Sequence, residues 1–181
     1  MFCSKCGNEL EEGSKMCSCC RAKVGEEVIT LLDFFDAKDT EYSPEQLPIY
    51  LKAAEQGDMN AQYKCGVMYD GVDGIAEDAA AALHWYRKAA EQGHVSSQYN
   101  CGLMYDAGEG IPKDKKEALY WYSRAAEQGD ADAQFKCGIM YEKGEGTNQD
   151  WKEALNWYRK AAAQGHIEAK HCVQEAEARG N

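Results

Sequence analysis

Several features that define whole classes of protein are missing from this sequence. It has no run of about 18 apolar residues, which excludes a transmembrane helix. Positive charge is scarce, because 20 Lys and Arg stand against 31 Asp and Glu, for a net charge of −11. That balance argues against a protein that coats nucleic acid or an anionic membrane. The motifs H-E-x-x-H, G-x-S-x-G and the P-loop are also absent, so the sequence predicts no enzyme.

A secretory signal is missing at the start of the sequence as well. The residues from Met1 to Cys6 do not combine a basic stretch with a following apolar stretch. We therefore expect a cytoplasmic protein, in which cysteines are usually reduced. There are nine cysteines, an odd number, so they cannot all pair within one chain. Metal ligation and burial therefore explain them better than a disulfide framework.

What is present divides the chain into two domains and a connector. Residues 1–23 hold five of the nine cysteines and carry a net charge of +1. Residues 24–42 form an acidic connector with a dense apolar group, Val28, Ile29, Leu31, Leu32, Phe34 and Phe35. This connector is interpreted either as a helical cap over the next domain or as a helical ligand for another protein. Residues 43–180 repeat themselves.

The first domain has the cysteine spacing of a zinc site. Two C-x2-C turns are separated by ten residues, and each turn can supply two thiolates to a tetrahedral ion. The expected ligands of a structural Zn²⁺ are Cys3, Cys6, Cys17 and Cys20, with Cys19 as a substitute for Cys20. A redox pair would need a surrounding strand and helix, and none is visible. So small a module has almost no core, and zinc would supply on the order of 10 kcal/mol of its folding free energy. The segment resembles the short zinc-ribbon modules of bacterial N-termini.

The second domain has an internal period of 36 residues. The sequence A-A-E-Q-G occurs at residues 53–57, 89–93 and 125–129, and A-A-A-Q-G occurs at 161–165. Single glycines at 66, 102 and 138 and Trp-Tyr pairs starting at 85, 121 and 157 keep the same period. A fixed period of this length is typical of a solenoid.

Each 36-residue unit is predicted to be a pair of helices. In the unit 58–93, Asp58 caps a first helix that reaches about Asp70, and a second helix runs from about Ala79 to Gln92. Gly108 and Gly144 supply left-handed residues that end the first helices of later units. The predicted array is all-α and contains a half unit (43–57), three full units (58–93, 94–129, 130–165) and a capping helix (166–178).

Two segments of this array resemble a known repeat family. Residues 133–141 (AQFKCGIMY) and 154–162 (ALNWYRKAA) are similar to the Sel1-like repeat, a relative of the tetratricopeptide repeat. The resemblance covers about residues 44–178. It implies a right-handed αα-solenoid that acts as a protein-interaction scaffold. Cysteine stands at 65, 101 and 137, where the family usually has leucine.

Helical spacing indicates which residues of the array are buried. Cys65, Cys101 and Cys137 share one core position and are expected to be unpaired small hydrophobes, whereas Cys172 is expected to be exposed. His94 and His166 occupy the helix-capping position of Asp58. A narrow polar strip on the first helices is the candidate partner surface, formed by Asn60, Lys64, Ser96, Asn100, Asp132 and Lys136.

These observations favour a non-enzymatic adaptor that binds a protein through the solenoid and makes a second contact through the zinc ribbon. One alternative is a regulator that touches nucleic acid through the basic residues of the ribbon, Lys5, Lys15, Arg21 and Lys23. A less favoured alternative is an enzyme, because some cysteine-rich Sel1-like proteins are linked to β-lactam binding. Those proteins carry two disulfide-bonded cysteines per repeat, and this chain has one cysteine per repeat.

Overall fold

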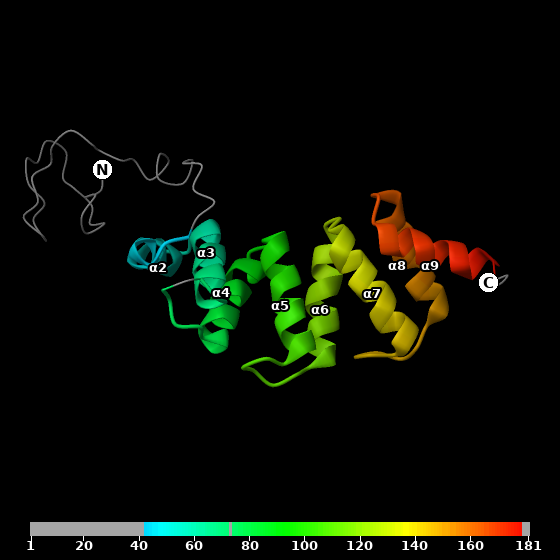
Figure 1. The fold of residues 1–181 in the computed structure, drawn as a ribbon, viewed down its shortest axis with the longest axis horizontal. Coiled ribbons are helices and arrows are strands. Elements are labelled where there is room, and N and C mark those ends of the chain that lie inside the picture. The colour runs from blue at the N-terminus through cyan, green and yellow to red at the C-terminus, as the bar shows by residue number, and fades with distance from the viewer. Residues whose placement is uncertain (1–41, 73, 179–181) are drawn as a thin grey trace, which may run out of the picture.

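The computed structural model describes residues 42–72 and 74–178, and in these residues every regular element is helical. A single 3₁₀ turn and eight α-helices follow one another: η1 (Pro44–Gln46), α2 (Leu47–Glu55), α3 (Met59–Tyr69), α4 (Ala79–Glu91), α5 (Val95–Ala107), α6 (Lys115–Glu127), α7 (Ala131–Lys143), α8 (Trp151–Ala163) and α9 (Ile167–Ala178). Each helix packs on the next, and the pairs stack in a row from α2 to α9 (Figure 1). The predicted all-α solenoid is therefore confirmed.

The helix ends lie where the sequence placed them, because short side chains and glycines satisfy the terminal backbone groups. The Asp58 carboxylate accepts the Ala61 N–H at 2.6 Å and starts α3. Gly108 and Gly144 follow α5 and α7 with φ of 75° and 71°, the left-handed conformation that glycine adopts without a Cβ penalty. At the start of the array, the Ser43 N–H donates to the Gln46 side chain at 3.0 Å.

One close contact within each unit explains the repeated glycine. Gly66, Gly102 and Gly138 lie against the rings of Tyr86, Tyr122 and Tyr158, which are almost completely buried. A Cβ at any of the three glycines would lie 2.4–2.5 Å from a ring carbon. Glycine therefore lets the two helices of a unit approach closely enough to bury the tyrosine.

A buried row of glutamines connects neighbouring units. Each buried glutamine donates from Nε2, at 3.0 Å, to a carbonyl of the preceding helix, and accepts, at 2.7–2.8 Å, from the glutamine that ends the following helix. The acceptor carbonyls, in chain order, are those of Ala54, Ala90 and Ala126; the buried residues are Gln62, Gln98 and Gln134; and their donors are Gln92, Gln128 and Gln164. The recurring A-A-E-Q-G sequence thus supplies both a carbonyl and an amide to this row.

The last described helix, α9, carries polar residues on its outer face. Ala169 and Ala176 of α9 are buried against α8, whereas Lys170, Gln174 and Glu177 are exposed. A polar outer face of this kind is suited to a solenoid helix that faces water on that side.

Candidate interaction surfaces

The predicted polar strip lies on three successive helices, α3, α5 and α7. Its first members, Asn60, Ser96 and Asp132, are exposed, and its second members, Lys64, Asn100 and Lys136, are half-buried. The 36-residue period thus brings the six residues to equivalent places along the array, two on each helix. Their binding of a partner stays a prediction.

Three of the six strip residues also contact other parts of the array. Lys64 Nζ donates to the Tyr50 hydroxyl at 3.3 Å and lies 4.7 Å from the centre of that ring. Asn100 hydrogen-bonds the hydroxyl of Tyr86. Asp132 Oδ1 lies 3.3 Å from Nε2 of His166. Half of the strip residues therefore also make contacts within the array. Sequence spacing could not reveal these contacts.

Next to the strip, the same helices carry half-buried apolar side chains. Tyr63, Tyr99 and Phe135 form one row, with Val67, Leu103 and Ile139 one turn further along. The aromatic members lie 5.6–6.0 Å, centroid to centroid, from Tyr86, Tyr122 and Tyr158. Because these side chains keep some exposed surface beside polar residues, the helix face offers both apolar and polar contacts to a partner.

Two histidines act as helix caps, as predicted from their alignment with Asp58. His94 Nδ1 accepts the Ser97 N–H at 3.2 Å, and the ring stacks on Tyr63 with centroids 4.5 Å apart. His166 Nδ1 accepts the Ala169 N–H at 3.3 Å. Burial lowers the pKa of His94, which keeps its ring neutral and able to accept.

The acidic residue at the end of the first helix has a different partner in the middle unit than in the units on either side. Tyr86 and Tyr158 donate their hydroxyls to Asp70 and Glu142 at the ends of α3 and α7, at 3.1 and 2.5 Å. In the middle unit Lys115 binds the equivalent Asp106, and it also reaches Glu145 of the next unit at 2.6 Å. The buried hydroxyl of Tyr122 is left without a hydrogen-bond partner.

Three of the four cysteines in the described part of the chain are inert core residues. Cys65, Cys101 and Cys137 are free and completely buried, and burial raises the pKa of each thiol to about 12. The prediction of unpaired core cysteines is confirmed. The expectation of an exposed Cys172 was wrong. This thiol is half-buried beside the last core cluster, and the equivalent positions Lys64, Asn100 and Lys136 are half-buried as well.

The predicted zinc ligands, Cys3, Cys6, Cys17, Cys19 and Cys20, lie outside the described residues, as do the basic residues of the ribbon and nearly all of the connector. Within residues 42–72 and 74–178, no group of three His, Cys, Asp or Glu side chains is placed to hold a metal ion. The helices of this part of the chain are also too short or too polar to span a bilayer.

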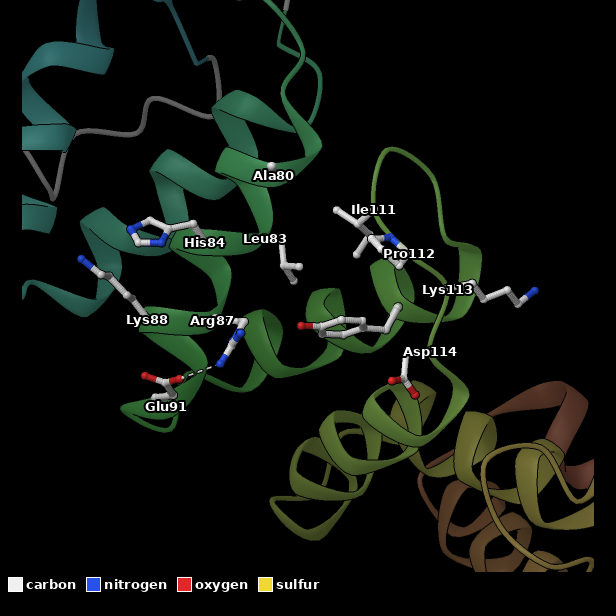
Figure 2. Close-up of a pocket in the computed structure, with 11 residues that line it drawn as sticks. Ala80, Leu83, His84, Arg87, Lys88, Glu91, Ile111, Pro112, Lys113 and Asp114 are labelled. Carbon is white, nitrogen blue, oxygen red and sulfur yellow. Dashed lines mark ion pairs between the residues drawn. The ribbon is translucent and has the colours of Figure 1, made fainter.

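A groove that sequence analysis missed runs between α4 and the loop that joins α5 to α6. It has a volume of about 610 Å³ and is lined by residues of two units, which Figure 2 shows. From α4 come Ala80, Leu83, His84, Arg87, Lys88 and Glu91, and from the second unit come Tyr105, Ile111, Pro112, Lys113 and Asp114. We call it the α4 groove. No pattern within one unit predicts it, because neither unit forms it alone.

Comparison with known proteins is consistent with this architecture. A family model of the Sel1 repeat matches residues 49–58, 60–94, 95–130 and 131–166. The chain is similar to a Sel1 repeat protein from Oxalobacter formigenes, with 40% identity and a TM-score of 0.63 over 70% of this chain and 95% of the other. No curated protein matches it.

Two further solved structures share the fold. A protective antigen of uropathogenic Escherichia coli with an SLR fold is 38% identical over 75% of this chain, with a TM-score of 0.71. The chain spans only 29% of that antigen. The cysteine-rich protein B of Helicobacter pylori is 22% identical over 71% of this chain and 92% of its own, with a TM-score of 0.54, and shows the fold alone.

Proposed function

The chain belongs to the Sel1-repeat family, and from that premise we propose that it is a non-enzymatic adaptor. Sel1-repeat proteins are generally protein-interaction scaffolds. In this adaptor the α3, α5 and α7 surface binds one protein partner, and the cysteine-rich N-terminal segment forms a zinc ribbon that adds a second contact.

The observation that carries the proposal is the contrast between buried and exposed positions of the repeat. The buried glutamine, cysteine and glycine are the same in all three units. The exposed position at the start of the helices changes from Asn60 to Ser96 to Asp132. These shared buried residues hold the units in one stacked geometry, while differing surface residues give each unit its own contacts. Such an extended and varied surface is suited to recognising a folded or extended protein partner.

The binding surface is tested by affinity capture from the source cells, with the full chain as bait. Asn60, Ser96 and Asp132 are replaced together by the long cationic side chain of lysine (N60K, S96K, D132K), and the matched control changes exposed residues of the second helices (Lys116→Glu and Arg159→Glu). We expect a captured protein to be lost with the first variant and retained with the control. Equal retention by both variants would show that the strip is not the binding surface.

The zinc ribbon is supported by the two C-x2-C turns alone, and it is tested by metal analysis of the purified full chain. We expect about one Zn²⁺ per chain, lost in the Cys3→Ser and Cys17→Ser variants and kept in Cys137→Ser, whose thiol is buried in the array. Separate Cys19→Ser and Cys20→Ser variants identify the fourth ligand. Full zinc content in Cys3→Ser would rule out the proposed ligand set.

A further inference from the structure

The α4 groove combines an apolar floor with a charged rim. Leu83 of α4 and Ile111 of the α5–α6 loop are half-buried and line it from opposite sides (Figure 2). Arg87, Lys88 and Lys113 are exposed along its edges. A shallow apolar surface edged by cations is suited to a peptide that carries apolar and acidic side chains.

The wall of the groove opposite α4 is held in place by the fold. Gly110 has a φ of 70°, and a Cβ there would lie 2.5 Å from the Cβ of Ala79, so the loop rests directly on the start of α4. The Asp114 N–H donates to the Tyr105 carbonyl at 3.0 Å, which closes the loop. The groove is therefore preformed, and a ligand would not have to order it.

The same place in the following unit keeps only part of these features, with Leu119 for Leu83 and Arg124 for Lys88. There, Thr147, Asn148 and Gln149 stand where Ile111, Pro112 and Lys113 form the groove, and Ser123 replaces Arg87. Gln149 turns back to donate to the Glu142 carbonyl at 2.7 Å. Leu47 and Ile75 hold the places of Leu83 and Ile111 at the preceding junction, so the apolar pair is not unique to the α4 groove. Arg87 and Lys113 are specific to it, because Leu51 and Glu77 replace them in the preceding unit.

The acidic residues of the groove neutralise only part of its positive charge. Arg87 lies 3.6 Å from Glu91, in an exposed pair that is worth little in water. The Asp114 carboxylate accepts the backbone N–H groups of Lys116 and Glu117 and caps α6. Lys88 is exposed, and its ammonium lies over the Trp85 ring at 4.8 Å from the ring centre. A net positive edge is unusual in a chain with a charge of −11.

One segment of this same chain has the complementary chemistry. Residues 26–36, EEVITLLDFFD, contain four acidic residues, no basic residue and six large apolar residues. They lie outside the described residues. Six peptide units separate Asp36 from Tyr42, which packs on the first core cluster, and an extended chain of that length reaches about 20 Å. This is about two helix diameters.

This segment does not fit as one more repeat helix ahead of α2. Carried back by one period of 36 residues, Thr30 takes the place of Gly66 and Glu26 takes the place of the buried Gln62. At Gly66 a side chain would lie 2.4 Å from the tyrosine ring, and a carboxylate at the Gln62 position could not donate to a carbonyl. The apolar residues of the segment therefore need a different surface to cover them.

We propose that residues 26–36 of this chain dock in the α4 groove. The apolar side chains of the segment lie on Leu83 and Ile111, and its acidic residues lie beside Arg87, Lys88 and Lys113. The docked segment then occupies the α4 groove. A partner with a similar acidic and apolar peptide would have to displace residues 26–36 to bind there.

Photo-crosslinking in the full chain tests the proposal. A benzoylphenylalanine replaces His84 at the edge of the groove, and the matched control carries it in place of Tyr120, the equivalent exposed position of α6. After irradiation, mass spectrometry identifies the attached residues. Crosslinks to residues 26–36 from position 84 and not from position 120 support docking, and the product mass tells attachment within one chain from attachment between two copies. No crosslink, an equal yield from both positions, or attachment elsewhere would overturn it.

Two further variants of the crosslinking chain separate the groove from the fold. The triple change I111T, P112N and K113Q copies the residues that the chain already holds at 147–149, so helicity measured by circular dichroism is expected to be unchanged. The quadruple change E26Q, E27Q, D33N and D36N removes the acidic charges of the segment and keeps its apolar residues. Each should lower the crosslink yield at position 84 roughly tenfold. An unchanged yield with either variant would refute the complementarity on which docking rests.

Discussion

Replacement of Gln98 by leucine is expected to weaken the junction between the first and second units. Gln98 is completely buried, donates to the Ala90 carbonyl at 3.0 Å and accepts from Gln128 at 2.7 Å. Each lost hydrogen bond contributes about 1 kcal/mol. The Ala90 carbonyl still accepts the Gly93 N–H, and the exposed Gln128 can bond water, so no penalty for an unpartnered buried group is added. The free energy of unfolding should therefore fall by about 2 kcal/mol.

Urea denaturation of the full chain, followed by far-UV circular dichroism, measures this change. With an m-value of about 2 kcal/mol/M, a loss of about 2 kcal/mol moves the midpoint down by roughly 1 M. Because each unit of a solenoid is stabilised by its neighbours, a weaker central junction should also broaden the transition. Asn156→Ala, at an exposed site of α8, is the matched control and should leave the curve unchanged.

The Gln98→Glu variant distinguishes hydrogen bonding from packing. Glutamate has nearly the shape of glutamine, but its second oxygen would face the Ala90 carbonyl without a proton to donate. Burying that charge costs more than removing the bonds, so Gln98→Glu should be less stable than Gln98→Leu at neutral pH. A Gln98→Glu variant as stable as the unmodified chain would show that the row of glutamines acts by shape alone, and the reasoning would fail.

Three other predictions concern single side chains of the repeat. Tyr122→Phe removes a buried hydroxyl that has no partner and should leave the urea midpoint unchanged or higher, whereas Tyr158→Phe loses the bond to Glu142 and should cost about 1.5 kcal/mol. Gly102→Ala places a Cβ 2.5 Å from the Tyr122 ring and should cost about 1–3 kcal/mol in the same assay; a neutral result would mean that the helices separate freely. Burial lowers the pKa of His94 below its unfolded value of about 6.5, so the stability from its neutral ring is complete above that pH and is lost as the pH falls through the folded pKa. Thermal unfolding at several pH values should show a smaller loss on acidification for His94→Asp, because aspartate caps the equivalent helices at Asp58 and Asp130 and has no imidazole to protonate.

Much of the fold could be predicted because its signals are local. The capping role of Asp58, the left-handed Gly108 and the burial of Cys101 each depend on residues within one turn or one helix pair. Periodicity then extends each local result to every unit. The buried stripe and polar outer face of α9 were predictable for the same reason, since Ala169 keeps the place of Ala133 and the outer residues are polar.

The candidate sites were less predictable because they depend on pairs of units. Spacing indicated the polar strip, but not that Lys64, Asn100 and Asp132 are engaged by other side chains. Lys115 was an ordinary helix residue in the sequence, and only the stacked units bring it to both Asp106 and Glu145. The half-burial of Cys172 likewise follows from the packing of α9 on α8.

The sequence by itself determined the repeat length, the helix boundaries, the buried positions and the spacing of the N-terminal cysteines. These follow from backbone hydrogen bonding and helical periodicity, which operate over a few residues. Only the tertiary structure decided how Gln62, Gln98 and Gln134 join neighbouring units and where the α4 groove opens. Those features arise where side chains about 30 residues apart meet, and their contacts depend on how each helix pair is oriented on the next.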